Sequence, residues 1–177
     1  MLKDKDGCLI FEDYLDFKPN KTPEEMFNYG ILEGTYFRPI FSSIANKNLK
    51  DCHKKFTFLS EIPENKLSSP LSHKNKNKNK YKVSVGSTLE YWEEKGWIKS
   101  PDFYGWIEFY CNFYNGRRIS DDLRQIKRWI AIAGPNGRFR KNLIRQIYES
   151  GKKYNDYTVS PKIRQTLLHS LLTMAEL

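Results

Sequence analysis

Basic side chains gather in one short part of this sequence, between residues 116 and 153. The segment holds eleven Lys or Arg and only three acids, so its net charge is +8, while that of the whole chain is +9. Seven of the eleven are Arg, whose planar guanidinium binds phosphate or carboxylate oxygens in pairs. The segment therefore favours binding of a polyanion, and nucleic-acid phosphates are the most common row of anions.

The spacing of these cations places most of them on two helices. Within the first expected helix they recur at steps of three and one, and within the second at steps of three and four, which keeps each set on one side. We expect the helices to form a hairpin across residues 134–137, with one continuous basic face. The predicted nucleic-acid-binding residues are Arg117, Arg118, Arg124, Lys127, Arg128, Arg138, Arg140, Lys141 and Arg145.

Other interpretations of the basic face stay open. It could be a solvated surface that keeps the protein dispersed, or a contact for an acidic protein. The same surface would also suit an enzyme acting on nucleic acid, of the nuclease or glycosylase type, or a structural subunit of a ribonucleoprotein. Our leading expectation is a non-enzymatic nucleic-acid-binding domain, with DNA and RNA equally compatible.

Residues suited to catalysis are few and scattered. The three histidines, His53, His73 and His169, lack the mutual spacing of metal ligands, and His169 is expected to be structural. Asp121 and Asp122 are expected in the first turn of a helix, where its dipole favours acids without a metal. The sequence predicts no catalytic residue, no metal site and no cofactor.

Composition points to a folded protein inside the cell. Hydrophobic residues make up 39% of the chain and aromatic residues 15%, so large rings supply much of the expected core. Three cysteines without a CxxC pair suit a reducing compartment. The sequence shows no secretory signal and no apolar run long enough for a membrane span, so we expect a nuclear or cytoplasmic location, with an organelle as an alternative.

The hydrophobic pattern predicts a mainly α fold, a compact helical single domain over 1–177 with long irregular connections and room for one short extended segment at 35–44. Helices are expected after Thr22, Ser87, Ser120 and Ser160 as N-caps, and from about Gly137. Each basic helix also has a predicted inward face. That of the first basic helix is Leu123, Ile126, Trp129, Ile130 and Ala133, and that of the second is Phe139, Leu143, Ile144, Ile147 and Tyr148.

An aromatic segment precedes the basic helices. Its rings recur at helical spacing, which predicts a buried stripe made of Trp106, Phe109, Tyr110 and Phe113. Single-strand binders stack bases on exposed rings beside a cationic groove. Tyr104, Tyr114 and Trp97 stand near the ends of elements and are therefore the rings that we expect to be exposed.

Residues 46–82 are expected to form an irregular insertion. Its alternating Lys/Asn run, 74–80, has no apolar face to offset the entropy of ordering, which predicts a mobile loop. Outside the insertion, three blocks, 11–40, 104–143 and 160–169, resemble an uncharacterised small family of predicted eukaryotic and large-DNA-virus proteins. The shared motifs are YGWxxFYCxFYxGRR, RQIKRW, AGPxGRFR and SPxIRQTLxH. This resemblance implies one folded unit and brings no activity or site residues.

Overall fold

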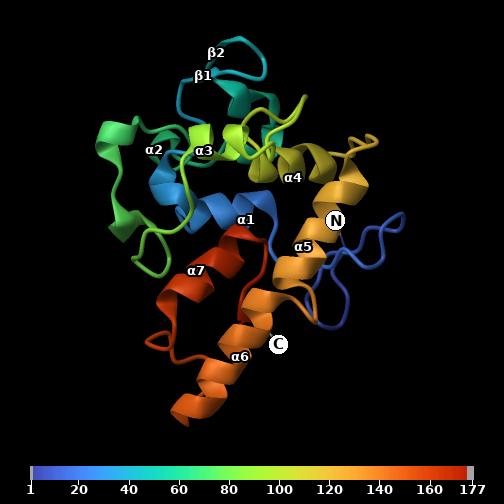
Figure 1. The fold of residues 1–177 in the computed structure, drawn as a ribbon, viewed down its shortest axis with the longest axis vertical. Helices are drawn as coiled ribbons and strands as arrows, with labels where there is room; N and C mark the ends of the chain where they lie inside the picture. The colour runs from blue at the N-terminus through green and yellow to red at the C-terminus, as the bar shows by residue number, and fades with distance from the viewer. Residues whose placement is uncertain (1, 175–177) are drawn as a thin grey trace.

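Helices form most of the regular structure of this protein, which a computed structural model describes for residues 2–174 (Figure 1). The mainly α fold is confirmed. The helices are α1 (Pro23–Asn28), α2 (Glu64–Leu67), α3 (Leu89–Glu94), α4 (Trp106–Tyr114), α5 (Asp122–Ala133), α6 (Arg138–Ser150) and α7 (Pro161–His169). Short 3-10 turns are η1 (Ile31–Gly34), η2 (Cys52–Lys55), η3 (Thr57–Leu59), η4 (Leu71–His73) and η5 (Lys76–Lys78). Strands β1 (Ile40–Ser42) and β2 (Lys47–Leu49) pair as an antiparallel hairpin.

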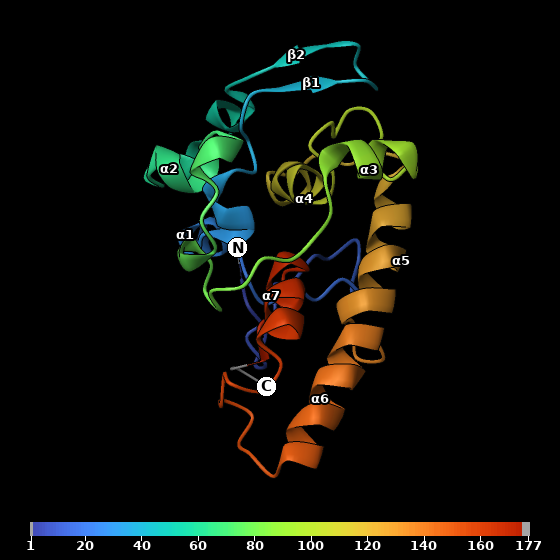
Figure 2. The same cartoon turned by 60° about the vertical axis from the view of Figure 1, so that its left-hand side comes forward.

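The two basic helices, α5 and α6, follow one another end to end instead of forming the expected hairpin (Figures 1 and 2). The connection is a single tight turn in which the Gly137 N–H donates to the Gly134 carbonyl at 2.8 Å. Gly137 lies so close to the end of α5 that a Cβ there would stand 2.5 Å from the Ile132 carbonyl atoms. The turn offsets the helix axis without reversing it, and we call the pair the α5–α6 rod.

The core is one hydrophobic cluster that runs from Leu9 to Met174. At its centre Phe109, Tyr110 and Phe113 of α4 are fully buried, so the predicted aromatic stripe is confirmed for these three, while Trp106 is half-buried. Phe17 enters from the N-terminal segment and contacts rings of α4 and α5 edge-on, with centroids 5.2–6.3 Å apart. Edge-to-face pairs at such distances add to the stabilisation that burial provides.

Several local predictions require correction. Leu123, Ile144 and Tyr148 are 49%, 47% and 86% exposed, although the pattern assigned them to inward faces. The outer half of α6 extends past the core, so only the side that meets α7 is covered (Figure 2). The N-cap of α3 is Thr88, whose hydroxyl accepts from the Tyr91 N–H, and that of α5 is Asp121. Each differs by one residue from the serine that we expected.

The acidic N-terminal segment packs along the rod. Residues 12–17 and four residues of α5 line a shared surface hollow. The predicted capping box of α1 is present: the Thr22 hydroxyl accepts from the Glu25 N–H at 3.1 Å, and the Glu25 carboxylate accepts from the Thr22 N–H at 2.7 Å. The N-terminal third therefore supplies both core rings and negative charge to the neighbourhood of α5.

The Lys/Asn run has specific contacts, which its composition did not predict. Asn79 is buried; its side chain accepts from the Glu33 N–H at 2.8 Å and donates to the Val83 carbonyl at 2.7 Å. The Lys78 carbonyl lies where a Cβ on Gly30 would stand, 1.9 Å away, so the run rests directly on the turn before η1. Hydrogen bonds to backbone, rather than an apolar face, hold the end of this run.

We expect Gly137→Ala to lower the free energy of unfolding by about 1–3 kcal/mol, because the added methyl group would overlap the last turn of α5. Urea unfolding followed by circular dichroism measures the change. Asn136→Ala in the same turn is the control, since Asn136 is exposed. Equal stabilities for the two variants would show that the close contact between the helices does not form.

Two asparagines of the Lys/Asn run should behave differently. Asn79→Ala leaves a buried N–H and a carbonyl without partners, which we expect to cost about 1–3 kcal/mol of unfolding free energy. Asn77→Ala should be neutral, because Asn77 is exposed and its side chain faces solvent. Chemical denaturation of both variants measures the two changes. An unchanged unfolding free energy in Asn79→Ala would mean that the two hydrogen bonds of the Asn79 side chain do not stabilise the run.

Candidate nucleic-acid interface

The acidic N-terminal segment neutralises part of the predicted basic face. Arg118 forms an ion pair with Asp13, and its Nη1 donates to the Phe113 carbonyl at 2.7 Å. Its guanidinium lies 3.6 Å from the centroid of the Phe113 ring. The Arg118 side chain holds the pKa of Asp13 below its usual value through their hydrogen bond. Arg118 is thus engaged within the protein, and its role as a phosphate ligand stays a prediction.

Arg117 is also paired with a carboxylate of the protein. Its two terminal nitrogens donate to the two carboxylate oxygens of the buried Asp102, at 2.6 and 2.7 Å. Asp102 also accepts from the Asn112 side-chain amide at 2.7 Å, which links the start of α4 to its end. A bidentate pair of this kind has both charges satisfied. Arg117 is therefore already paired within the protein, and its predicted contact with nucleic acid stays a prediction.

Two further cations, Lys127 and Arg140, lie on the side of the rod that faces the N-terminal segment. Lys127 is exposed but lines the hollow shared with Glu12, Asp13 and Asp16. Arg140 is half-buried near Cys8 of the N-terminal segment, and burial lowers the pKa of Arg140. These positions lie on the other side of the helices from Arg128 and Arg138. The predicted single face is consequently divided into two.

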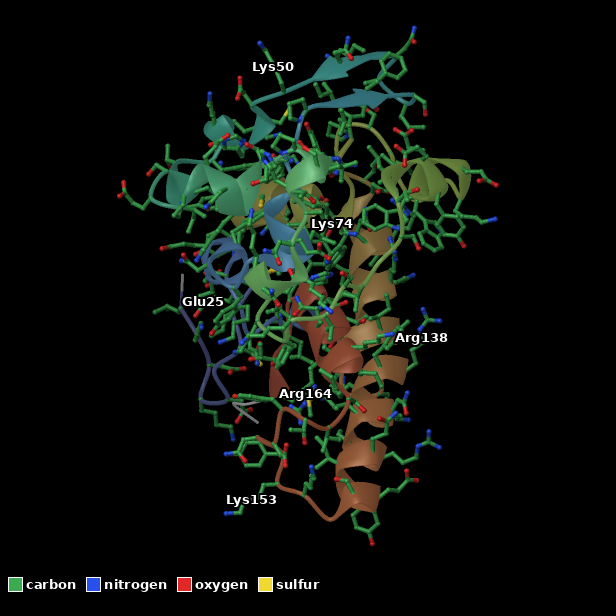
Figure 3. The ribbon with its side chains drawn as sticks, turned by 90° about the vertical axis from the view of Figure 1, so that its left-hand side faces the viewer. Glu25, Lys50, Lys74, Arg138, Lys153 and Arg164 are labelled. Carbon is green, nitrogen blue, oxygen red and sulfur yellow. The ribbon has the colours of Figure 1, made fainter. Side chains whose placement is uncertain are left out.

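Four cations remain on the opposite side of the rod, and we call them the basic row: Arg128, Arg138, Lys141 and Arg145. Figure 3 labels Arg138 at the junction between α5 and α6. Lys141 and Arg145 follow it at helical spacing. Arg124 begins the same side, but it is paired with Asp121 through two bonds of 2.6 Å. Arg145 has a long, exposed contact of 3.9 Å with Glu149, which contributes little in water.

Arg128 stands out within the basic row. It is half-buried, and within residues 2–174 no carboxylate lies within ion-pair distance of it. Burial lowers its pKa, and the positive charges of Arg124 and Arg138 lower the pKa further. Its guanidinium lies 4.9 Å from the centroid of the Trp97 ring. Arg128 is therefore a partly desolvated cation that is stabilised by an aromatic ring and repelled by its charged neighbours.

Next to Arg128 lies a cavity of about 240 Å³, which we call the tryptophan cavity. All four tryptophans of the chain line it: Trp92, Trp97, Trp106 and Trp129. Its other walls come from α6, from the end of α7, from η1 and from the segment 85–87 that leads into α3. Figure 2 shows the ribbons of α3, α5 and α7, three of the elements that supply lining residues. Arg128 and Arg138 are the two cations in its lining.

The tryptophans differ in how they are held. The indole N–H of Trp129 donates to the Ser170 carbonyl at 2.6 Å, and that of Trp106 donates to the His169 carbonyl at 3.1 Å. These two indoles fix the end of α7 against the rod and α4. Trp92 is half-buried, Trp97 is 39% exposed, and neither indole N–H has a protein partner within residues 2–174. Two of the four rings are thus left with free donors.

The three rings that were predicted to be exposed differ in their exposure. Trp97 is exposed as expected, and Tyr114 is half-buried. Tyr104 is only 2% exposed, and its hydroxyl donates to the Arg38 carbonyl at 2.8 Å, so the expectation for this ring was wrong. Sequence reasoning missed the tryptophan cavity, because its lining comes from five separate segments. The four tryptophans are spread over positions 92 to 129, and no linear pattern relates them to one site.

His169 lies in the cavity wall as a neutral imidazole. Tyr81 N–H donates to Gln165 Oε1 at 3.1 Å, so the amide nitrogen of Gln165 faces His169 Nε2, 3.0 Å away. The Leu32 N–H also donates to Nε2, at 3.4 Å. Nε2 therefore accepts and the proton sits on Nδ1, which has no protein partner within residues 2–174. Burial lowers the pKa of His169 to about 3, in agreement with this arrangement.

Within residues 2–174, no group of three or more His, Cys, Asp or Glu is arranged to hold a metal ion. Over the same range, no helix has both the length and the apolar surface that crossing a membrane requires. No family model matches the chain, and no curated protein or solved structure matches it either. The resemblance noted from the sequence motifs stays a prediction.

Mild acid should destabilise the protein through His169. The pKa of this imidazole is about 3 in the folded protein and 6.5 in its ordinary state, so between these values the unfolded chain binds a proton that the folded protein does not. The contribution of the neutral His169 to the unfolding free energy should therefore be fully present above about pH 6.5. It should decrease as the pH falls toward 3. Urea unfolding at several values between pH 7 and 5 measures this decrease before most carboxylates titrate.

In His169→Gln the same decrease should be smaller, because the glutamine oxygen can accept from Leu32 without titrating. His73→Gln is the control, since His73 is exposed and its loss should leave the pH dependence as it was. An unchanged slope in His169→Gln would contradict a neutral, half-buried imidazole.

Proposed function

We propose that this protein binds nucleic acid, without acting on it as an enzyme, through the basic row of the α5–α6 rod. One observation supports this above the others: Arg128 is half-buried beside two other arginines, and it has no carboxylate partner within residues 2–174. A protein usually pairs a guanidinium in such a place. An anion from outside would supply the missing partner, and the row of four cations suits a row of anions.

The length of the row fits phosphates along one strand. Helices α5 and α6 are about 18 and about 20 Å long at 1.5 Å per residue, and the row occupies the second half of one and most of the other. Mutual repulsion among these cations costs stability in the free protein. Phosphates relieve the repulsion and release condensed counterions, which makes binding dependent on salt.

Exposed apolar groups accompany the charges on α6. Ile144 and Tyr148 are 47% and 86% exposed, and they alternate with Lys141 and Arg145 at helical spacings of three and four. A solvated face that served only solubility would gain nothing from an exposed ring. A tyrosine between cations is a common platform for stacking a base of a single strand. This pattern supports nucleic acid over an acidic protein as the partner.

Charge variants on the two sides of the rod should separate the roles. We expect Arg138→Gln, Lys141→Gln and Arg145→Gln each to weaken binding of a labelled single strand and to reduce the log–log salt slope by about 0.7. Lys127→Gln removes an exposed cation from the side that faces Glu12 and Asp16, so it should change binding little. Fluorescence anisotropy with DNA and RNA strands and duplexes, at several salt concentrations, measures both quantities.

Polyglutamate of equal charge serves as the competitor in the same assay. Displacement of the strand only by nucleic acid supports the proposal, whereas equal displacement by polyglutamate favours an acidic protein partner. A flat salt slope, or equal losses in Lys127→Gln and Arg138→Gln, would remove the basic row as the binding surface. Cleavage or base loss in the incubated strands would instead indicate an enzyme.

A further inference from the structure

The tryptophan cavity has the dimensions of a site for one ring system. Its volume of about 240 Å³ lies below the range of roughly 300–1,000 Å³ that drug-sized ligands occupy. A whole dinucleotide cofactor would not fit, whereas a single planar ring with a substituent at the mouth would. The walls are mostly aromatic and aliphatic side chains, which favours a flat, apolar-faced guest.

The wall holds several strong donors, and its hydroxyl groups, those of Tyr36, Ser87, Thr166 and Ser170, can both donate and accept. Nδ1–H of His169 and the indole N–H groups of Trp92 and Trp97 have no protein partner within residues 2–174. Arg128 and Arg138 add guanidinium donors, and among the described residues no Asp or Glu belongs to the lining. The guest that satisfies this wall carries acceptor atoms on its ring and a negative charge near it.

We infer that the tryptophan cavity binds one unpaired nucleobase, with the phosphate next to that base held by Arg128 and Arg138. The inference rests on the proposed function in one respect: if the base belongs to a strand, the basic row would bind the neighbouring phosphates of that strand along α6. Nucleobases have ring nitrogens and carbonyl oxygens as acceptors and π-faces for stacking. Their phosphates supply the charge that the two arginines lack.

The entrance supports a base rather than a purely aliphatic guest. Trp97 forms part of the rim with 39% of its surface exposed, and Arg128 already covers one of its faces at 4.9 Å. A base that enters beside Trp97 would lie next to the same guanidinium that receives its phosphate. Segment 85–87 also lines the cavity, and a Cβ on Gly86 would lie 3.7 and 3.8 Å from the Leu32 and Trp92 side chains.

The same ring and phosphate could come from a strand or from a free nucleotide, and two experiments distinguish these sources. The first compares a single strand with an abasic strand of equal length and charge. The full-length protein should bind the intact strand more tightly, by about 5- to 150-fold for one stacked base. Trp97→Ala should reduce this preference and leave the salt slope unchanged. Arg145→Gln, distant from the cavity, should reduce the slope and leave the preference unchanged.

The second experiment uses nucleoside 5′-monophosphates and the indole signals in a proton–nitrogen correlation spectrum. The chain has four tryptophans, and Trp97→Phe assigns the signal of Trp97. The Trp97 signal should move on addition of a monophosphate and stay in place with inorganic phosphate alone. Movement with monophosphates in a protein that binds no strand would support the cavity site and reject the proposed function.

Two outcomes overturn the inference. One is equal affinity for intact and abasic strands together with normal binding by Trp97→Ala, which would leave the basic row as a binding surface and the cavity without a role. The other is an unmoved Trp97 signal with every monophosphate and with the intact strand. Because Trp97 is exposed, its replacement should leave folding intact, and the unfolding midpoint of Trp97→Ala checks this directly.

Discussion

The close packing of Gly137 on the last turn of α5 is the constraint on which the rest of the site depends. Only a residue without a Cβ can approach the Ile132 carbonyl so closely, and this approach makes α6 continue the line of α5. Arg128 and Arg138, ten residues apart, consequently meet at one cavity. A reversed hairpin would have placed α6 beside α5 and given a different wall. The geometry of one turn thus decides which cations act together.

Ion pairs with acids, as well as helical spacing, decide where unpaired positive charge lies on the rod. On one side, Asp13 and Asp102 bind arginines that precede α5, while acids of residues 12–16 face Lys127. On the other side, within residues 2–174, no carboxylate pairs with Arg128. The excess positive charge of the segment is therefore concentrated on the side that borders the tryptophan cavity. The acidic N-terminal segment thus leaves unpaired positive charge mainly on the side of the rod away from it.

The end of α7 joins the cavity to the core. Two indole N–H groups donate to consecutive carbonyls, those of His169 and Ser170, so the tryptophans that line the cavity also hold this end in place. His169 in turn accepts from η1 through its Nε2 atom. The part of the wall formed by Trp106, Trp129 and the end of α7 is therefore fixed by hydrogen bonds. A preorganised wall of this kind loses little conformational freedom when a guest is bound.

The linear pattern was enough to predict the mainly α class, the capping box of α1, the buried stripe of α4 and the bounds of the basic helices within a residue or two. These features depend on spacing and on contacts between near neighbours in the chain, which a linear pattern contains. Tertiary structure alone decided that α5 and α6 form a rod, that Ile144 and Tyr148 are exposed, and that Arg117 and Arg118 are paired. It also brought four tryptophans from separate segments to one cavity. The reason is physical: which side of a helix is covered, and which charge meets which, depends on segments far away in the sequence that no local periodicity records.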